Sequence, residues 1–281
     1  MKKIVLFTIA LAMTWAINAQ IQTPAPSPLS KVEQKVGLTD ITIEYSRPGV
    51  KEREIFGGLE AYDKIWRTGA NARTKITFSD DITFAGQAVE AGTYAIFAKP
   101  GKSSWDVYLY TEHEGSGVPQ DWDDSKVAAK TTVEAQPIPF VVETFTIDIN
   151  SIRNSSATLD LMWEKTYVAV PFEVPTDALV MASIEKTMSG TAEFNDYYAA
   201  AGYYLSEGKD PKKAKEWMDK AMAMNDQPQF WQLRQQSLIY AAAGDKAGAI
   251  DLAKKSMAAA EEAGNAQYVQ MNKDSLAEWA Q

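Results

Sequence analysis

Hydrophobic and polar residues alternate with a period of two from about residue 31 to residue 175. The segment ITIEYS places Ile41, Ile43 and Tyr45 on one face, and TKITFSDDITF repeats this alternation. The stretch GTYAIFAKPGKSSWDVYLY predicts a hairpin, because the turn-forming sequence Pro-Gly-Lys-Ser separates two such runs. Further runs extend from ETFTIDIN to AVPFEV, with predicted Asn-Ser and Glu-Lys-Thr turns between them. Many short strands without intervening helices predict an antiparallel β-sandwich or barrel over residues 31–175.

The hydrophobic spacing becomes helical at Thr176. Residues 176–190, TDALVMASIEKTMSG, begin with an N-cap threonine and end at a glycine, which predicts a connecting helix. Residues 191–281 predict two pairs of helices and a final helix that caps the exposed end, with Gly208 and Gly244 at the same place in each pair. The Tyr-x-x-Ala-x-Tyr-like first helices and Ala-rich second helices resemble tetratricopeptide repeats; a plain helical-hairpin bundle packed on the β-domain is the alternative. The predicted fold class is therefore α+β, with a β-domain followed by an all-α helical-hairpin region.

The N-terminal segment MKKIVLFTIALAMTWAINA has two lysines, an apolar run and small residues at its end. This order is typical of a secretory signal peptide, and we expect cleavage after Ala19. A membrane-anchor helix is the alternative, but the apolar run is short for a span of ~20 residues. The Pro-rich residues 20–30 predict a linker. We therefore expect a periplasmic or secreted protein with no membrane anchor after cleavage.

Charge and cysteine content exclude several classes of protein. The 281-residue chain carries a net charge of −9, and loss of Lys2 and Lys3 with the signal peptide would make it −11. Such an acidic chain matches phosphate backbones and anionic membranes poorly, so we expect no nucleic-acid partner. Without cysteine, the protein has no lipid-modified cysteine and no disulfide, so its stability depends on packing.

The segments YSRPG and WRTGAN, with the nearby Arg73, contain the strongest candidate binding residues, which are Arg47, Trp66, Arg67, Asn71 and Arg73. If both loops lie at one rim of the sandwich, the three arginines could meet beside Trp66. Arginine binds carboxylates and phosphates bidentately, and a tryptophan face stacks on a sugar or a cation. This interpretation predicts a site for a small anionic or glycan ligand. In the structural alternative Arg67 pairs with Glu44 or Asp63, Trp66 fills the core and Asn71 bonds the backbone.

The remaining motifs indicate no cofactor and no metal. Three carboxylates surround Trp122 in VPQDWDDSK, namely Asp121, Asp123 and Asp124. Calcium is the alternative there, but the glycine and the distal glutamate of an EF-hand are missing, which favours a turn with a capping aspartate. The single histidine, His113, lies in a polar loop with no nucleophile elbow nearby, so we expect neither a catalytic triad nor a common zinc site.

Residues from about 30 to 175 resemble the bacterial domain-of-unknown-function family 2911 nearly end to end. The resemblance is carried by VGLTDITIEYSRPGVKEREIFGG, KIWRTGANARTKITFSDDI, AGTYAIFAKPGKSSWDVYLY, WDDSKVAAKTTVEAQPI, VETFTIDI and ATLDLMWEKTYVAVPF. It implies an exported β-domain that is followed in many members by a helical repeat tail. It implies no activity, because the family has none that could be assigned to particular residues.

The hypothesis that these observations favour is a non-enzymatic binding protein with a rim site on the β-domain. The aromatic residues of the helical tail, such as Tyr197 and Trp231, would mostly pack the repeats, while some could line a concave face that binds a protein partner. The alternative is an envelope-associated hydrolase acting on a glycan or small anionic substrate, with Glu44 as general base.

Overall fold

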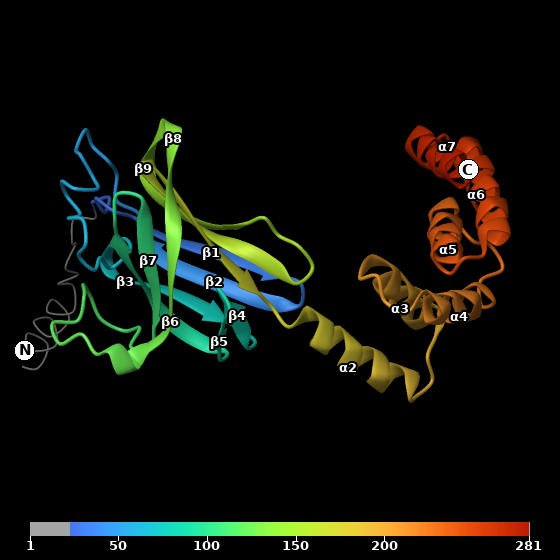
Figure 1. Cartoon of the computed structure of the whole chain (residues 1–281), viewed down its shortest axis with the longest axis horizontal. Coiled ribbons are helices and arrows are strands. Elements are labelled where there is room, and N and C mark those ends of the chain that lie inside the picture. Colours follow the sequence, from blue (N-terminus) through green and yellow to red (C-terminus); the bar gives the residue numbers. More distant parts are fainter. Residues whose placement is uncertain (1–22, 281) are drawn as a thin grey trace, which may run out of the picture. The chain divides into compact units, whose positions relative to one another are not determined.

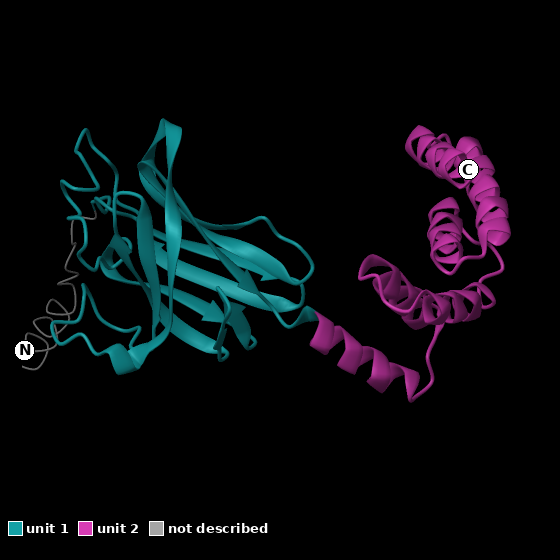
Figure 2. Cartoon of the chain, viewed as in Figure 1, with its two compact units in different colours: residues 1–176 teal, residues 177–281 magenta. Residues whose placement is uncertain are grey.

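The computed structural model describes residues 23–280, so the expected signal peptide and the start of the expected linker lie outside the described residues. The chain divides after Thr176 into two compact units, a β-unit and a helical unit (Figure 2). Within the described residues, the β-unit contains a nine-stranded antiparallel sheet and six helices follow it. The predicted α+β class is confirmed.

The β-unit is one sheet that bends into two layers (Figure 1). Its strands are β1 (Leu29–Val36), β2 (Thr39–Ser46), β3 (Ala70–Phe78), β4 (Ile82–Phe84), β5 (Gln87–Val89), β6 (Gly92–Pro100), β7 (Ser104–Tyr110), β8 (Val127–Asn150) and β9 (Ser156–Glu173). Their order in the sheet is β1-β2-β3-β6-β7-β8-β9-β4-β5. Strand β8 joins the layers, because its first part pairs with β7 and its second part with β9. Across the core, the ring of Phe78 lies 6.2 Å from that of Phe172.

The alternation in the sequence decides which side chains enter this core. In β2, Ile41, Ile43 and Tyr45 are buried, and the residues between them are more exposed. The Tyr45 hydroxyl donates to the Ile147 carbonyl at 3.1 Å and accepts from the Ile147 amide at 2.9 Å. Strand β2 is therefore tied to β8 of the facing layer by hydrogen bonds as well as by apolar packing.

A cluster of large aromatic rings fills part of the core. Trp66 is only 4% exposed, and its ring stacks on Trp163 with the centroids 5.7 Å apart. Phe56, Trp105 and Phe145 pack against Trp66 edge-on. Buried aromatics contribute much of a core's stabilisation, so the loop that carries Trp66 is held firmly from the inside.

Two strand boundaries differ from the expectation. Strand β1 begins at Leu29, inside the expected linker of residues 20–30, because Leu29 already pairs with Ser46 of β2. The expected Glu-Lys-Thr turn at residues 164–166 is wrong, since β9 continues through it. Glu164 has a φ of +53° and pairs with Val142, and the register shifts on both sides of this pair because β8 contributes more residues there than β9. The turn-like sequence therefore lies opposite an irregular stretch of β8.

The second unit consists of short helices. They are α2 (Thr176–Met188), α3 (Phe194–Ser206), α4 (Pro211–Met222), α5 (Phe230–Ala242), α6 (Lys246–Glu262) and α7 (Ala266–Trp279). Gly208 and Gly244 follow α3 and α5 with φ of +61° and +84°, which glycine adopts without strain. Asp210 and Asp245 then cap α4 and α6 through their side chains. In the described part of the chain, no helix is both long and apolar enough to cross a membrane.

Candidate functional site

A pocket of about 260 Å³ opens where the segments quoted above as YSRPG and WRTGAN meet in space. Its lining comes mainly from residues 48–60, which follow β2, and from residues 67–70, which lead into β3, and residues 26–27 before β1 complete it. Trp163 of β9 forms part of its wall. This site is called the Arg67 pocket below. Segments that are separate in the sequence therefore build one cavity.

Backbone pairing holds Arg67 at this pocket. The Trp66 amide donates to the Ala98 carbonyl at 2.7 Å, and the Ala98 amide donates back to the Trp66 carbonyl at 3.0 Å. On the other side of Arg67, Thr68 is fully buried and its carbonyl accepts a hydrogen bond from the Thr74 hydroxyl. Because both neighbours are fixed in the interior, the Arg67 side chain is left at the pocket wall.

The Arg67 guanidinium makes no hydrogen bond or ion pair with any residue that the structure describes, and its Nε is buried without a partner. The expected partners lie elsewhere: Glu44 is 4.0 Å from the Lys75 ammonium, and Asp63 lines another pocket. A buried donor without an acceptor costs about 1–3 kcal/mol. An oxyanion entering the pocket would supply that acceptor together with a compensating charge.

Glu60 is the second titratable group of the pocket. Burial raises the pKa of its carboxyl to about 7, although the guanidiniums of Arg67 and Arg53 act in the opposite direction. Its backbone is held by the tight loop, since its amide donates to the Ile55 carbonyl at 2.8 Å. Near neutral pH the Glu60 side chain is therefore a mixture of a carboxylic acid and a carboxylate. A neutral carboxylic acid can donate a hydrogen bond to an anion.

The rest of the wall adds positive charge and another N–H donor. Arg53 donates to the carbonyls of Val50 and Gly49 at 3.0 and 2.6 Å, which ties down the first loop. Lys51 also lines the pocket, and in the described chain its side chain has no ion-pair partner. The buried indole Nε1 of Trp163 lacks an acceptor as well. Cations and unpaired donors around one acid suit a small oxyanion.

The other residues predicted for this site hold the loops instead of lining the pocket. Arg47 donates to the Phe145 carbonyl at 2.9 Å and to the Thr146 hydroxyl at 2.7 Å, so it fastens the end of β2 to β8. Trp66 lies in the aromatic core, where its ring is closed to solvent. Asn71, with a φ of +59°, donates to the Ser27 carbonyl and the Ser46 hydroxyl, both at 3.2 Å.

Arg73 lies in a different environment. Its guanidinium is 7% exposed and donates to the carbonyls of Glu112 and Gly117 at 2.7 and 3.2 Å. It also forms an ion pair with the Glu112 carboxylate at 3.2 Å. Arg73 therefore anchors the loop after β7. Of the five predicted residues, only Arg67 lines the Arg67 pocket, and Glu60 was missed because an acid in a loop carries no local signal of burial.

The acidic segment near Trp122 forms a turn. Asp123 caps the short helix η2 (Asp124–Lys126) by accepting from the Ser125 amide at 2.9 Å, and Asp124 accepts from the Trp122 indole at 2.8 Å. Residues 23–280 contain no group of three or more histidines, aspartates or glutamates that could hold a metal ion. The imidazole of His113 lies 3.2 Å from the carboxylate of the neighbouring Glu114.

Comparison with protein-family models matches residues 27–172 to the family described as "Protein of unknown function (DUF2911)". The match begins within the expected linker and ends one residue before the end of β9, and it includes both segments of the Arg67 pocket. Searches of curated proteins and of solved structures found no significant match.

Proposed function

Because the chain belongs to the DUF2911 family, whose description names no activity, we propose a function from its site: an exported, non-enzymatic protein whose Arg67 pocket binds a small oxyanion. The observation that carries this proposal is the Arg67 guanidinium, which lines the pocket and has no partner in the described chain. Lys51 adds charge on the same wall. On a chain of net charge −9, this local cationic site favours an anion by direct contact.

Binding of inorganic sulfate and of acetate, measured by calorimetry on the full chain, tests this function. We expect Arg67→Met to weaken binding about tenfold or more, because a hydrogen bond to a charged group contributes ~1.5–3 kcal/mol. Arg153→Met is the matched control, since Arg153 is exposed and its side chain donates to the neighbouring Ile152 carbonyl. Equal affinity of wild type and Arg67→Met for both anions would refute the proposal. A preference between sulfate and acetate would tell a tetrahedral ligand from a carboxylate.

The helical unit is proposed to be a tetratricopeptide-like tail that binds a protein partner. Helices α3 and α5 begin at Phe194 and Phe230, 36 residues apart, close to the ~34-residue period of such repeats. Equivalent glycines end the first helix of each pair, as described above. Repeats of this kind present an extended concave surface to peptides and proteins. A pull-down in which deletion of residues 190–281 changes nothing would contradict this role.

The rival proposal is a hydrolase acting on a glycan or small anionic substrate at the same pocket. One observation favours it: burial raises the pKa of the Glu60 carboxyl to about 7, near the pH at which a general acid or base works best, and this group lines the same pocket as Arg67. In this version Glu60 replaces Glu44 as the acid–base group, because Glu44 does not line the pocket. A screen of glycan, ester and phosphate substrates that stays silent for wild type, or is equally active in Glu60→Gln, would remove this alternative.

Export to the periplasm or beyond is proposed from the charge and hydropathy of the N-terminal residues. Mass spectrometry of the protein recovered from cells or medium would test it. We expect a mature chain that begins at Gln20, and a chain that keeps its N-terminal apolar segment in the membrane would contradict it.

A further inference from the structure

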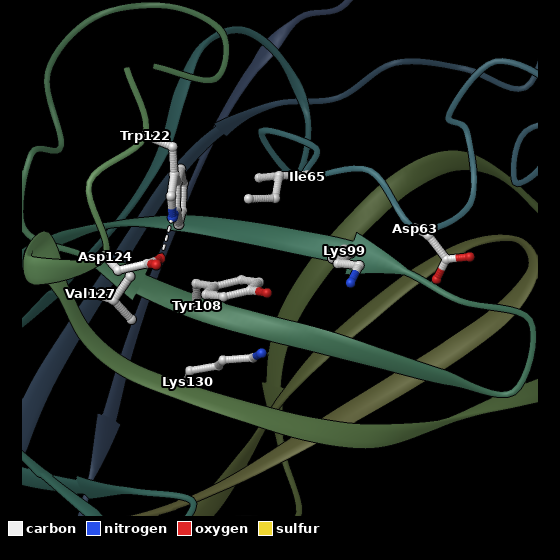
Figure 3. A pocket seen from close by; sticks show the side chains of 8 residues that line it. All are labelled: Asp63, Ile65, Lys99, Tyr108, Trp122, Asp124, Val127 and Lys130. Carbon is white, nitrogen blue, oxygen red and sulfur yellow. Dashed lines mark hydrogen bonds between the residues drawn. The ribbon is translucent and has the colours of Figure 1, made fainter. Parts of the chain in front are cut away.

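A second pocket, of about 610 Å³, lies on the outer face of strands β6, β7 and β8 (Figure 3). It is called the Tyr108 pocket here, and its polar lining consists of Asp63, Lys99, Tyr108, Trp122, Asp124 and Lys130. It shares no lining residue with the Arg67 pocket among the residues that the structure describes. The two pockets lie on different sides of one loop, since Ile65 packs on this outer face and the next residue, Trp66, enters the core.

Aromatic packing makes one wall of the Tyr108 pocket rigid. Trp122 stacks on Tyr110 with the centroids 4.6 Å apart, and it meets Tyr108 and Phe97 edge-on at 5.6 and 5.3 Å. Figure 3 shows the Tyr108 ring between Trp122 and Lys130, with its hydroxyl directed to the side where Lys99 lies. The pocket therefore combines an apolar surface with polar groups that face the same space.

The two ammonium groups of the pocket are in different situations. Lys130 is 3.0 Å from the Asp106 carboxylate and 5.2 Å above the Tyr108 ring. Asp106 also accepts from the hydroxyls of Thr132 and Tyr108, at 2.6 and 3.2 Å. Lys99, half-buried on β6, has no hydrogen bond or ion pair with any described residue. Lys99 is thus the cation that remains available to a ligand.

Carboxylates at the pocket rule out a simple anion site. Asp106 already neutralises Lys130, and Asp63 and Asp124 outweigh the charge of Lys99, so the net local charge does not favour a bare inorganic anion. Their oxygens accept hydrogen bonds from hydroxyl groups. Asp124 already accepts from the Trp122 indole, and a carboxylate has capacity for further bonds. A fitting ligand has several hydroxyls, one negative group and a ring with an apolar face.

We propose that the Tyr108 pocket binds an acidic sugar, with the carboxylate of a uronic acid at Lys99, the ring beside Tyr108, and hydroxyls donating to Asp63, which lies on the Lys99 side of the pocket (Figure 3). The site is separate from the Arg67 pocket, and it has a different chemistry. Its ligand is selected by hydroxyl groups and a ring as well as by charge.

The test is a titration of the full chain with glucuronate, glucose and inorganic sulfate, followed by NMR of the Trp122 indole N–H. This resonance is assigned by its loss in Trp122→Phe. We expect glucuronate to shift it, and Lys99→Met to weaken that binding about tenfold. Lys102→Met is the matched control, since Lys102 is exposed in the turn of the same hairpin and does not line the pocket. Glucose, which lacks the carboxylate, should bind about tenfold more weakly than glucuronate.

A further variant separates sugar recognition from anion binding. Asp63 has a φ of +59°, a conformation that asparagine also tolerates, so Asp63→Asn should fold normally. It should weaken glucuronate binding and leave sulfate binding unchanged or tighter. Arg67→Met should leave the glucuronate shift intact, which keeps this proposal independent of the Arg67 pocket. The absence of any Trp122 shift with glucuronate, equal affinity in Lys99→Met, or a Trp122 shift produced by sulfate at the same affinity as by glucuronate would each overturn the proposal.

Discussion

Replacing Glu60 by glutamine should stabilise the β-unit at alkaline pH and leave it nearly unchanged at acidic pH. Glutamine resembles the protonated glutamic acid in shape and hydrogen-bonding capacity, and it cannot ionise. In the wild type, burial raises the pKa of Glu60 from 4.5 to about 7, so the folded chain holds this proton more tightly than the unfolded chain. The substitution removes only the cost of ionising the group in the pocket.

The sign and size of the effect follow from this shift. Below pH 4.5 both states are protonated, and between pH 4.5 and about 7 the unfolded state loses its proton first. The free energy of unfolding therefore falls as the pH rises through this window. The full shift corresponds to about 3.4 kcal/mol at ~1.36 kcal/mol per pKa unit. Because Glu60 is partly open to water, screening reduces this value, and we expect about 1–2 kcal/mol.

Urea unfolding at pH 4 and pH 8 measures this difference. Near-ultraviolet circular dichroism reports on the β-unit, since the stacked Trp66 and Trp163 rings are in its core. The control is Glu54→Gln, which alters an exposed carboxylate in the same loop and should stay within about 0.5 kcal/mol of wild type. If Glu60→Gln gains no stability relative to wild type between pH 4 and pH 8, Glu60 ionises freely in the folded protein and the reasoning is refuted.

The remaining predictions concern the arginines and ligand binding. Arg73→Met should lower the free energy of unfolding by about 2–3 kcal/mol, because the carbonyls of Glu112 and Gly117 lose their donor; a urea midpoint close to wild type would contradict this. Arg67→Met should not lower that free energy and should raise it by up to about 1–3 kcal/mol, since the buried Nε of Arg67 has no acceptor in the described chain, and a large loss would show a structural role. Sulfate affinity, measured by calorimetry, should weaken between pH 5.5 and pH 8 as Glu60 ionises near pH 7 and repels the anion; Glu60→Gln should remove this dependence.

The sequence alone determined the elements and their order. The period-two alternation identified the strands around Ile41–Tyr45 and the hairpin at residues 92–110, and the change of period at Thr176 located the start of the helices. These features can be predicted from local sequence, because the spacing of residues along a strand or a helix decides which face each side chain occupies. Local sequence was misleading at residues 164–166, where a turn signal lies within strand β9, opposite an irregular stretch of β8.

Only the tertiary structure decided which of three similar arginines is free to bind. Arg47 finds its acceptor 98 residues away on β8, and Arg73 finds its own 39 residues away after β7. Arg67 finds none in the described chain, and no pattern around WRTGAN distinguishes it from the others. The burial of Glu60 and the convergence of Lys99 with Tyr108 and Trp122 are equally invisible in the sequence. Hydrogen-bond partners and burial are set by contacts between distant segments, and these exist only once the sheet has bent and its loops have packed.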